Sequence, residues 1–435
     1  MKKKSFNQWA LWFALLMVLT AIGAMITGNH KITGISLILM CIALSYGVQS
    51  FQSTKGLMLT MWIFAAVCVA MFFPQYFIVW GKGENAFVLE TRLITPLLQV
   101  IMFGMGAQMS LNDFKGVFKT PIAVSLGVIG RYTVGTLLAL AIVKIFTFDP
   151  LIAAGIILVA CVPSGLATNV MSFLANANVP LSITMSAIAT MLAPFITPFL
   201  MKIAGGAFID VNVWGMMFSI FKMVIIPIIA GFIFNLFNQK KERVKTKVMQ
   251  MCSFFVIILL AGIIGLATPG KFNYLQETVN FLIVFMLLPA VAGYLLSLKY
   301  KGEQTLIKNV LAKLSQIGIV TIVLVITAAG QQYLLEAGIL LLIVIIIHNI
   351  LGYIFGYCLA WAFKLSERDR RTIAIEVGMP NAGLASGLAP TIGAIGQVGL
   401  APAIYGPVMN ILGSTLASIW KSNPPKDRKK TNVEK

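Results

Sequence analysis

Glu376 is the residue of this sequence whose type and setting most clearly indicate chemistry, because it is an acid inside an apolar stretch. Of the 14 acidic residues, it alone does not lie in or beside a polar connection. Gly378, Pro380 and Asn381 follow it closely. A carboxylate in hydrocarbon is costly, so such residues usually face a protein cavity and handle ions or protons. Proline in a helix frees backbone groups, and secondary transporters build ion and substrate sites from such broken helices.

The segments that must position Glu376 are membrane helices by composition. Of all residues, 59% are apolar and 11% are charged, whereas soluble domains average about 45–50% and about 25%. The apolar runs are continuous over about 20 residues, as in spanning helices, and do not alternate as in a transmembrane strand barrel. The net charge of +19 does not indicate a nucleic-acid partner, because the basic residues lie between spans. The partner that this composition predicts is the lipid bilayer.

Hydropathy predicts about fourteen spans, and the basic residues predict their orientation. If the N-terminus lies inside, 25 of the 33 Lys and Arg residues lie on the inner side and 6 on the outer side, while Arg131 and Lys222 fall inside spans. This bias predicts a multi-pass protein of the plasma membrane with both termini in the cytoplasm. The expected spans are 9–27, 32–49, 57–79, 93–109, 121–146, 150–175, 180–202, 213–237, 248–268, 279–299, 313–331, 336–363, 372–396 and 399–420.

Two of these spans contain a similar interruption. Pro163 precedes Gly-Leu-Ala-Thr at 165–168, and Pro380 precedes Gly-Leu-Ala-Ser at 383–386. In the expected topology the first span runs from outside to inside and the second from inside to outside. Two similarly broken helices in opposite orientation are the sequence mark of an inverted repeat, with the site where they cross.

Five short motifs extend this pattern. They are Glu376-Val377-Gly378-Met379-x-Asn381-x-Gly383-Leu384, Phe103-Gly104-Met105-Gly106, Pro163-x-Gly165-x-Ala167-x-Asn169-Val170-Met171, His348-Asn349-x-x-Gly352-Tyr353 and Asn410-x-x-Gly413-Ser414. Together they resemble the bile acid:sodium symporter family over about residues 57–237 and 313–420. The resemblance implies an all-α polytopic transporter with two inverted halves of five helices, arranged as a panel domain and a core domain with two broken crossing helices.

The resemblance also implies a division of the chain, with four helices beyond the family's ten. Two extra helices precede the family region, and a pair is inserted in the second half. Packing or stability is their expected role, and a regulatory or oligomerisation role is the alternative. The expected divisions are 1–56 for the extra N-terminal helices, 57–203 for the first repeat with its break near 163–168, 204–420 for the second repeat with its break near 378–383 and the inserted pair at about 248–299, and 421–435 for a basic cytoplasmic tail.

A first sodium site is implied on five residues that can each offer an oxygen. Sodium is a hard cation that needs about five or six oxygen ligands, usually including one carboxylate. A lone Ser or Thr more often bonds to its own helix, but Ser182 and Ser186 are four positions apart and share a helix face. The five residues are Thr168, Asn169, Ser182, Ser186 and Glu376.

A second sodium site departs from the family's pattern. It would use the Glu376 carboxylate and the backbone oxygens of Val377 and Met379, but Arg131 and Pro380 stand where the family has glutamines. Neither supplies a side-chain oxygen. We hypothesise that the Arg131 guanidinium takes the place of the second sodium and pairs with Glu376, which leaves one Na⁺ as the bound ion. In the alternative reading, Arg131 lines a solvated cavity and binds an anionic substrate.

The expected substrate is a small organic anion, because the N-termini of half-helices favour negative charge. Leu166 stands where many family members have Thr, and Met409 stands where some have His. Both departures make the expected pocket more apolar. The sequence therefore leaves the substrate open among pantoate-like, glycolate-like and pyruvate-like acids and bile acids. The residues implied to contact it are Gly165, Leu166, Ala167, Thr168, Asn381 and Asn410.

The function predicted from these features is sodium-coupled symport by alternating access. The alternative is a sodium-independent or proton-coupled carrier of organic anions or oxyanions, with Arg131 replacing one sodium; a membrane sensor that binds without transport is a further alternative. No catalytic residues are predicted, because the two histidines and the single acid within the spans provide no nucleophile–base pair or metal set.

Overall fold

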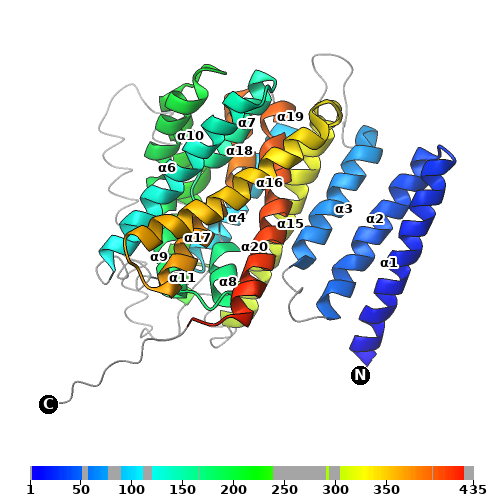
Figure 1. Cartoon of the computed structure of the whole chain (residues 1–435), viewed down its shortest axis with the longest axis horizontal. Helices are drawn as coiled ribbons and strands as arrows, with labels where there is room; N and C mark the ends of the chain where they lie inside the picture. Colours follow the sequence, from blue (N-terminus) through cyan, green and yellow to red (C-terminus); the bar gives the residue numbers. More distant parts are fainter. Residues whose placement is uncertain are drawn as a thin grey trace. The chain divides into compact units, whose positions relative to one another are not determined.

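The computed structural model describes residues 2–50, 57–76, 90–110, 120–165, 167–238, 291–292, 304–393 and 395–425. Their regular elements are helices (Figure 1), together with one isolated β-bridge. The chain divides into two compact units. One consists of Met1–Leu89, Asp113–Met216 and Val323–Lys435, and the other of Glu90–Asn112 and Met217–Ile322.

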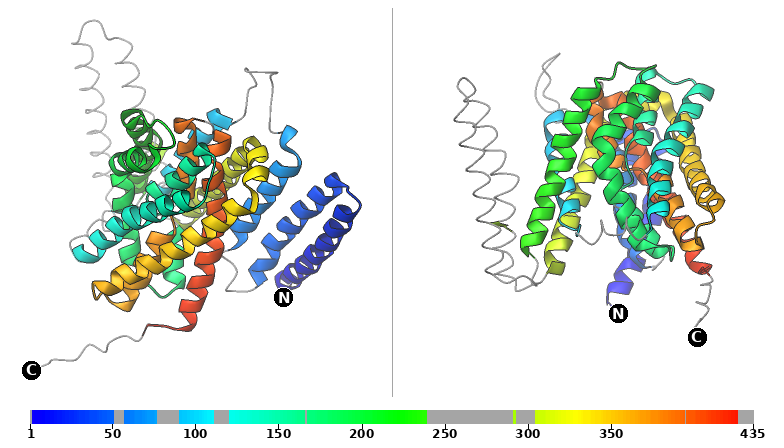
Figure 2. Two further views of the ribbon diagram at one scale, coloured as in Figure 1. Left: turned by 45° about the horizontal axis from the view of Figure 1, so that its top comes forward. Right: turned by 90° about the vertical axis from the view of Figure 1, so that its left-hand side faces the viewer.

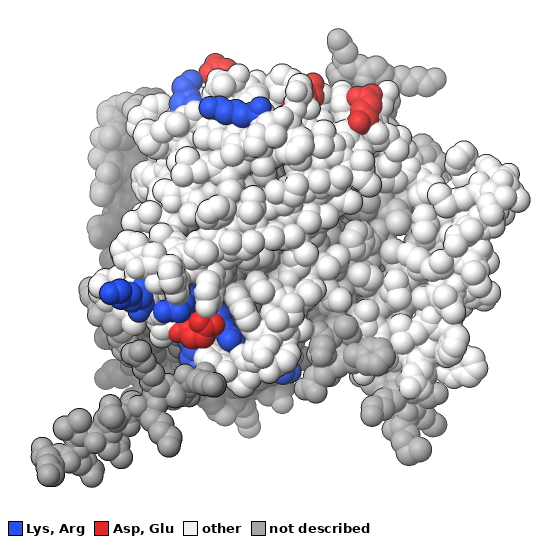
Figure 3. All heavy atoms as spheres, in the orientation of Figure 1, with Lys and Arg blue, Asp and Glu red and all other residues white. Residues whose placement is uncertain are grey.

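The described residues include eight helices that are long and apolar enough to cross a membrane. They confirm a polytopic, all-helical membrane protein. On the face in Figure 3, the charged side chains lie near two opposite edges and the surface between them is uncharged. The expected spans 248–268 and 279–299 lie outside the described residues. The eight long helices are Asn7–Ile26, His30–Ser50, Pro121–Ile145, Val179–Gly205, Val213–Leu236, Asn309–Ala329, Gln331–Ala362 and Ile395–Ser422.

The smaller unit is built from α4, α11 and most of α15. The rings of Phe103 and Phe234 lie 5.6 Å apart between centroids, and Asn235 Nδ2 donates to the Met109 carbonyl at 2.8 Å. These contacts join α4 to α11. The helices are α4 (Glu90–Gly106), α11 (Ile226–Asn238), which continues α10 (Val213–Ile220) through a π-helical turn, and α15 (Gln304–Ala329).

Three N-terminal helices of the larger unit lie side by side, with α2 between α1 and α3 (Figure 2). Asn29 begins α2, because its side-chain oxygen accepts from Ile32 N at 3.2 Å. Such caps satisfy one of the amides that a helix N-terminus leaves without a partner. The helices are α1 (Lys2–Ile26), α2 (His30–Gly47) and α3 (Met58–Phe72).

Two interrupted helices form the centre of the larger unit. The first, α7 (Pro150–Cys161), ends before Pro163 and resumes as α8 (Ala167–Leu174); the second, α17 (Glu367–Gly378), ends before Pro380 and resumes as α18 (Ala382–Ile392). Proline cannot donate the next helical hydrogen bond, and it forces the preceding residue out of the helical region. The breaks therefore lie in the expected stretches.

The two breaks pair with each other in antiparallel fashion. Gly165 N donates to the Met379 carbonyl at 3.2 Å, and Asn381 N donates to the Pro163 carbonyl at 2.7 Å. Ser164 and Pro380 form the isolated β-bridge. Backbone groups freed by one interruption thus find partners in the other, as buried backbone groups must.

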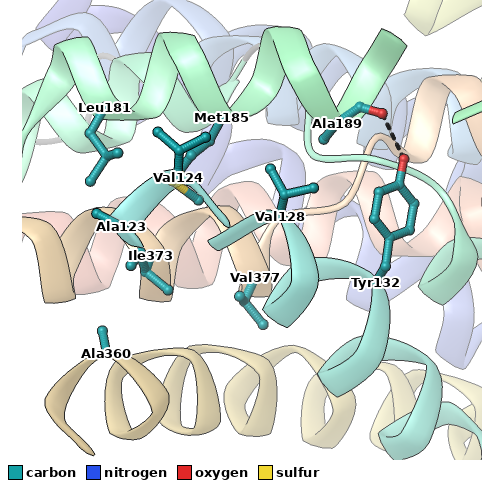
Figure 4. Packing of buried hydrophobic residues seen from close by; sticks show 10 residues of the cluster. All are labelled: Ala123, Val124, Val128, Tyr132, Leu181, Met185, Ala189, Ala360, Ile373 and Val377. Carbon is teal, nitrogen blue, oxygen red and sulfur yellow. Dashed lines mark hydrogen bonds between the residues drawn. The ribbon is translucent and has the colours of Figure 1, made fainter. Parts of the chain in front are cut away.

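A buried apolar cluster holds four helices around this crossing (Figure 4). It joins α6 (Pro121–Ile145), α9 (Val179–Leu200), α16 (Gln331–Ala362) and α17. Tyr132 on α6 donates its hydroxyl to the Ala189 carbonyl on α9 at 2.7 Å. The members are Ala123, Val124, Val128, Tyr132, Leu181, Met185, Ala189, Ala360, Ile373 and Val377.

Candidate functional site

The Glu376 carboxylate lies at the end of α17, is 1% exposed, and is bonded to hydroxyl groups of α9. Ser182 Oγ donates to Glu376 Oε1 at 2.5 Å. Ser186 Oγ lies 3.1 Å from Oε1 and 3.0 Å from Oε2. Both carboxylate oxygens therefore have partners without a neighbouring cation.

Three further side chains extend this group of oxygens. Ser182 Oγ lies 2.8 Å from Asn169 Oδ1, and Thr168 Oγ1 lies 3.2 Å from Ser186 Oγ. Ser164 Oγ lies 3.4 Å from Ser186 Oγ. The structure thus brings together all five residues of the first predicted sodium site, and Ser164 joins them. We call these six residues the Glu376 cluster.

The elements around the Glu376 cluster explain how it is positioned. Asn178 caps α9, because its side-chain oxygen accepts from Leu181 N at 3.2 Å. Leu181 and Met185 then pack into the apolar cluster, and Ser182 and Ser186 each follow one position later. Residues four apart share a helix face, so the packing of one stripe of α9 turns the adjacent hydroxyl stripe toward α17.

The predicted ion pair between Arg131 and Glu376 is wrong. No ion pair with an N–O distance within 4.0 Å joins these two described residues. The Arg131 guanidinium instead donates to backbone carbonyls at the two breaks. Nη1 reaches Val377 at 2.8 Å, Nε reaches Val162 at 3.1 Å, and Nη2 reaches the carbonyls of Val159 and Ala160 at 2.9 and 3.1 Å. Helix ends leave such carbonyls without intrahelical partners, and a planar five-donor fork can satisfy several at once.

The two backbone oxygens of the predicted second sodium site are therefore engaged in protein hydrogen bonds. The Val377 carbonyl accepts from Arg131, and the Met379 carbonyl accepts from Gly165 N. Asn349 Nδ2 donates to the Gly378 carbonyl at 2.6 Å. The neighbouring His348 is also buried, and its two ring nitrogens form hydrogen bonds with the Tyr405 hydroxyl and the Gly135 carbonyl.

The residues predicted to contact the substrate lie at the starts of the second half-helices. Ala167 is the first residue of α8, and Asn381 caps α18 through a bond from Leu384 N to its side-chain oxygen at 3.0 Å. Gly165 belongs to the antiparallel pairing, and Thr168 belongs to the Glu376 cluster. Leu166 lies outside the described residues. Asn410 is buried on α20 (Leu400–Ser422), and it forms no hydrogen bond with the described residues of the Glu376 cluster.

Sequence reasoning missed two functional candidates. Ser164 stands between the singled-out Pro163 and Gly165, so a hydroxyl inside the break was the available signal. Arg371 is one of the 25 basic residues that the expected topology places on the inner side, yet it is 5% exposed. Its guanidinium bonds to Glu367 Oε1, a partner that the spacing of four positions indicates. It also bonds to three carbonyls, which nothing in the local sequence indicates. The three carbonyls belong to Ala175, Trp420 and Asn423.

The ligand chemistry of the Glu376 cluster suits a monovalent hard cation. Its atoms are hydroxyl, amide and carboxylate oxygens, and it has one carboxylate. In the described part of the chain, no group of three or more His, Cys, Asp or Glu side chains could hold a metal ion. Transition metals select imidazole and thiolate, and divalent hard cations usually take several carboxylates.

Comparisons with known proteins agree with this reading. The family model described as Sodium Bile acid symporter family matches residues 95–278. The chain is 30% identical over 380 residues to the uncharacterized sodium-dependent transporter YocS of Bacillus subtilis (strain 168), covering 87% of this chain and 95% of that protein. It is 26% identical over 372 residues to the probable sodium/metabolite cotransporter BASS1, chloroplastic, of Oryza sativa subsp. japonica, covering 84% and 73%. It is 28% identical over 373 residues to the probable sodium/metabolite cotransporter BASS6, chloroplastic, of Arabidopsis thaliana, covering 83% and 74%. A match of this extent shows that the chain belongs to the sodium bile acid symporter family.

Proposed function

We propose that the protein is a secondary active transporter that couples sodium movement to the transport of a small organic anion. The observation that carries the proposal is the Glu376 cluster. An uncompensated carboxylate at membrane depth favours binding of a cation. The hydroxyl groups that now bond to Glu376 also carry lone pairs, so Ser182, Ser186 and Thr168 can turn these toward Na⁺. The names of the relatives support sodium as the ion and a metabolite as the cargo.

The anion would bind at the starts of α8 and α18, which meet at the crossing. Helix N-termini offer unpaired amides and the positive end of the helix dipole. Sodium at Glu376 would stabilise the arrangement of α8, α9 and α17, and the anion would then bind to half-helices that are already ordered. Coupling of this kind is reciprocal, so the anion must raise the affinity for sodium by the same factor.

The proposed architecture is an inverted repeat that works by alternating access. The repeats are 57–203 and 204–420, with the extra helices at 1–56 and about 248–299 and the tail at 421–435. The antiparallel pairing of the two proline breaks supports this assignment, because crossing broken helices in opposite orientation mark such repeats. The division into two compact units supports a core and a panel. The proposed location is the cell membrane, with both termini in the cytoplasm.

The first test is thermal unfolding of the detergent-purified protein in sodium chloride and in choline chloride at equal ionic strength. A ligand that binds only the folded state stabilises it by about 2.7 kcal/mol at a hundred times its Kd. We expect sodium to raise the Tm of the native protein and to have no such effect on Glu376→Gln.

The matched control is Glu336→Gln, because Glu336 is an exposed acid on α16 outside the Glu376 cluster. This variant should keep the full sodium response. A native protein whose Tm is the same in both salts at every concentration would overturn the sodium assignment. Counterflow of radiolabelled organic acids in proteoliposomes then separates a carrier from a sensor, since only a carrier exchanges solute across the membrane.

A proton-coupled carrier is the second candidate, and one observation favours it. Every partner of the Glu376 carboxylate within the Glu376 cluster is a hydroxyl, which can accept as well as donate. A protonated Glu376 would therefore also be satisfied by Ser182 and Ser186. In that case an imposed pH gradient, without sodium, would drive accumulation in proteoliposomes.

A further inference from the structure

Arg131 is a permanent positive charge at the crossing whose partners are carbonyl oxygens. Its side chain is 1% exposed, and its guanidinium stays protonated under all physiological conditions. It donates to Val159, Ala160 and Val162 at the end of α7, and to Val377 at the end of α17. A buried ion needs charge compensation as well as hydrogen bonds, and the described acids provide no ion pair to it.

The two half-helix ends supply this compensation. The C-terminus of a helix carries roughly half a negative elementary charge, located on its last carbonyl groups. The ends of α7 and α17 both point their carbonyls at Arg131, so together they offset about one positive charge. The guanidinium is thereby balanced without Glu376.

Four further carbonyls at the crossing also have fixed protein donors. The donors are Thr197 Oγ1 for Cys161 at 2.8 Å, Asn349 Nδ2 for Gly378 at 2.6 Å, Asn381 N for Pro163 at 2.7 Å and Gly165 N for Met379 at 3.2 Å. Together with the four carbonyls that accept from Arg131, eight carbonyls at the crossing therefore have protein donors. The Glu376 cluster is left for a mobile cation, because its one carboxylate forms no ion pair with a described residue.

We propose that Arg131 is a built-in cation of the crossing, so that the transporter binds one mobile monovalent cation, at Glu376. A neutral residue at position 131 would leave the carbonyls of Val159, Ala160, Val162 and Val377 without a donor and open a second site for a monovalent cation. This inference rests on the proposed function for the identity of the first site, at Glu376. The prediction of a second site depends only on the removal of the Arg131 guanidinium.

The test compares native protein with Arg131→Ala by thermal unfolding over a series of sodium chloride concentrations, with choline chloride keeping ionic strength constant. At saturating sodium, the folding equilibrium constant should rise with the first power of sodium concentration in native protein, and with the second power in Arg131→Ala. Arg131→Lys retains a cation near the carbonyls, so it should keep the first-power dependence.

Arg371→Ala is the matched control. Arg371 is likewise buried and donates to three carbonyls, but it also pairs with Glu367 at 2.8 Å and does not contact the breaks. Its removal should lower the Tm equally in sodium and in choline. If Arg131→Ala behaves in the same way, with no added sodium dependence, Arg131 is only a structural hydrogen-bond donor and the proposal is overturned.

Equilibrium binding of ²²Na⁺ to native protein decides the question even if Arg131→Ala does not fold. One ion per chain, lost in Glu376→Gln, supports the proposal, and two ions per chain contradict it. Failure of the proposed function looks different, because native protein would then bind no sodium. A sodium response that appears only in Arg131→Ala would in that case still support the second site.

Discussion

At the scale of single residues, the two serines of the Glu376 cluster have different hydrogen-bond partners. Ser182 bonds to one carboxylate oxygen and to Asn169, whereas Ser186 lies near both carboxylate oxygens and near Thr168. Each serine would therefore contribute its own ligand oxygen to a bound cation. We expect Ser182→Ala and Ser186→Ala each to weaken sodium binding about tenfold, which corresponds to about 1.4 kcal/mol. Sodium titrations of the Tm would measure the change.

Ser172→Ala provides the control for these serine substitutions. Ser172 is on α8 and fully buried, and its hydroxyl has no hydrogen-bond partner among the described residues. Removing a buried hydroxyl that lacks a partner is neutral or stabilising, so sodium affinity should not change. Equal losses in all three variants would mean that the effect reflects general packing and not cation ligation.

At the scale of helices, the position of Glu376 depends on how closely α17 packs against α16. A Cβ atom added to Gly356 on α16 would lie 2.8 Å from Val377 Cβ and 3.1 Å from Ala374 Cα. Two helices this close cannot separate locally without disturbing the bonds that Val377 and Glu376 make. Overpacking of this kind costs about 1–3 kcal/mol, so Gly356→Ala should lower the Tm and weaken the sodium response.

The control at this scale is Gly23→Ala on α1, where an added Cβ would meet no atom within 4 Å. Alanine favours helix formation over glycine by up to about 1 kcal/mol. This variant should therefore be as stable as native protein or slightly more so. A loss of stability equal to that of Gly356→Ala would show that close packing of α16 on α17 is not the cause.

At the scale of the whole molecule, the distribution of basic residues predicts an even number of spans. We expect reporter fusions at the N-terminus and the C-terminus both to report the cytoplasm, and a reporter inserted after Gly28, between α1 and α2, to report the opposite side. Termini on opposite sides would contradict the inverted-repeat assignment, because an odd number of crossings would place one repeat in the wrong orientation. The experiment also tests whether residues 239–303, of which the structure describes only 291–292, contain an even number of spans.

The sequence alone was sufficient for the membrane class and the two breaks, and with the family resemblance it also indicated the residues that gather around Glu376. The physical reason is that each depends on local chemistry. Continuous apolar runs require spanning helices, and Pro163 and Pro380 cannot continue a helix. Glu376 in an apolar segment requires oxygen partners, and the hydroxyls at Ser182 and Ser186 share a helix face. The family resemblance then indicated which hydroxyls and carboxylate belong together.

The partners of Arg131 were decided only by the tertiary structure. The sequence showed a cation, Arg131, and an acid, Glu376, within apolar spans, and their opposite charges suggested an ion pair. The guanidinium instead bonds to carbonyls up to 246 positions away, at Val377. Backbone carbonyls occur at every residue, so sequence cannot show which of them are left without partners. That is determined by where α7 and α17 end and how their ends meet, and those ends carry the negative charge that makes an acidic partner unnecessary.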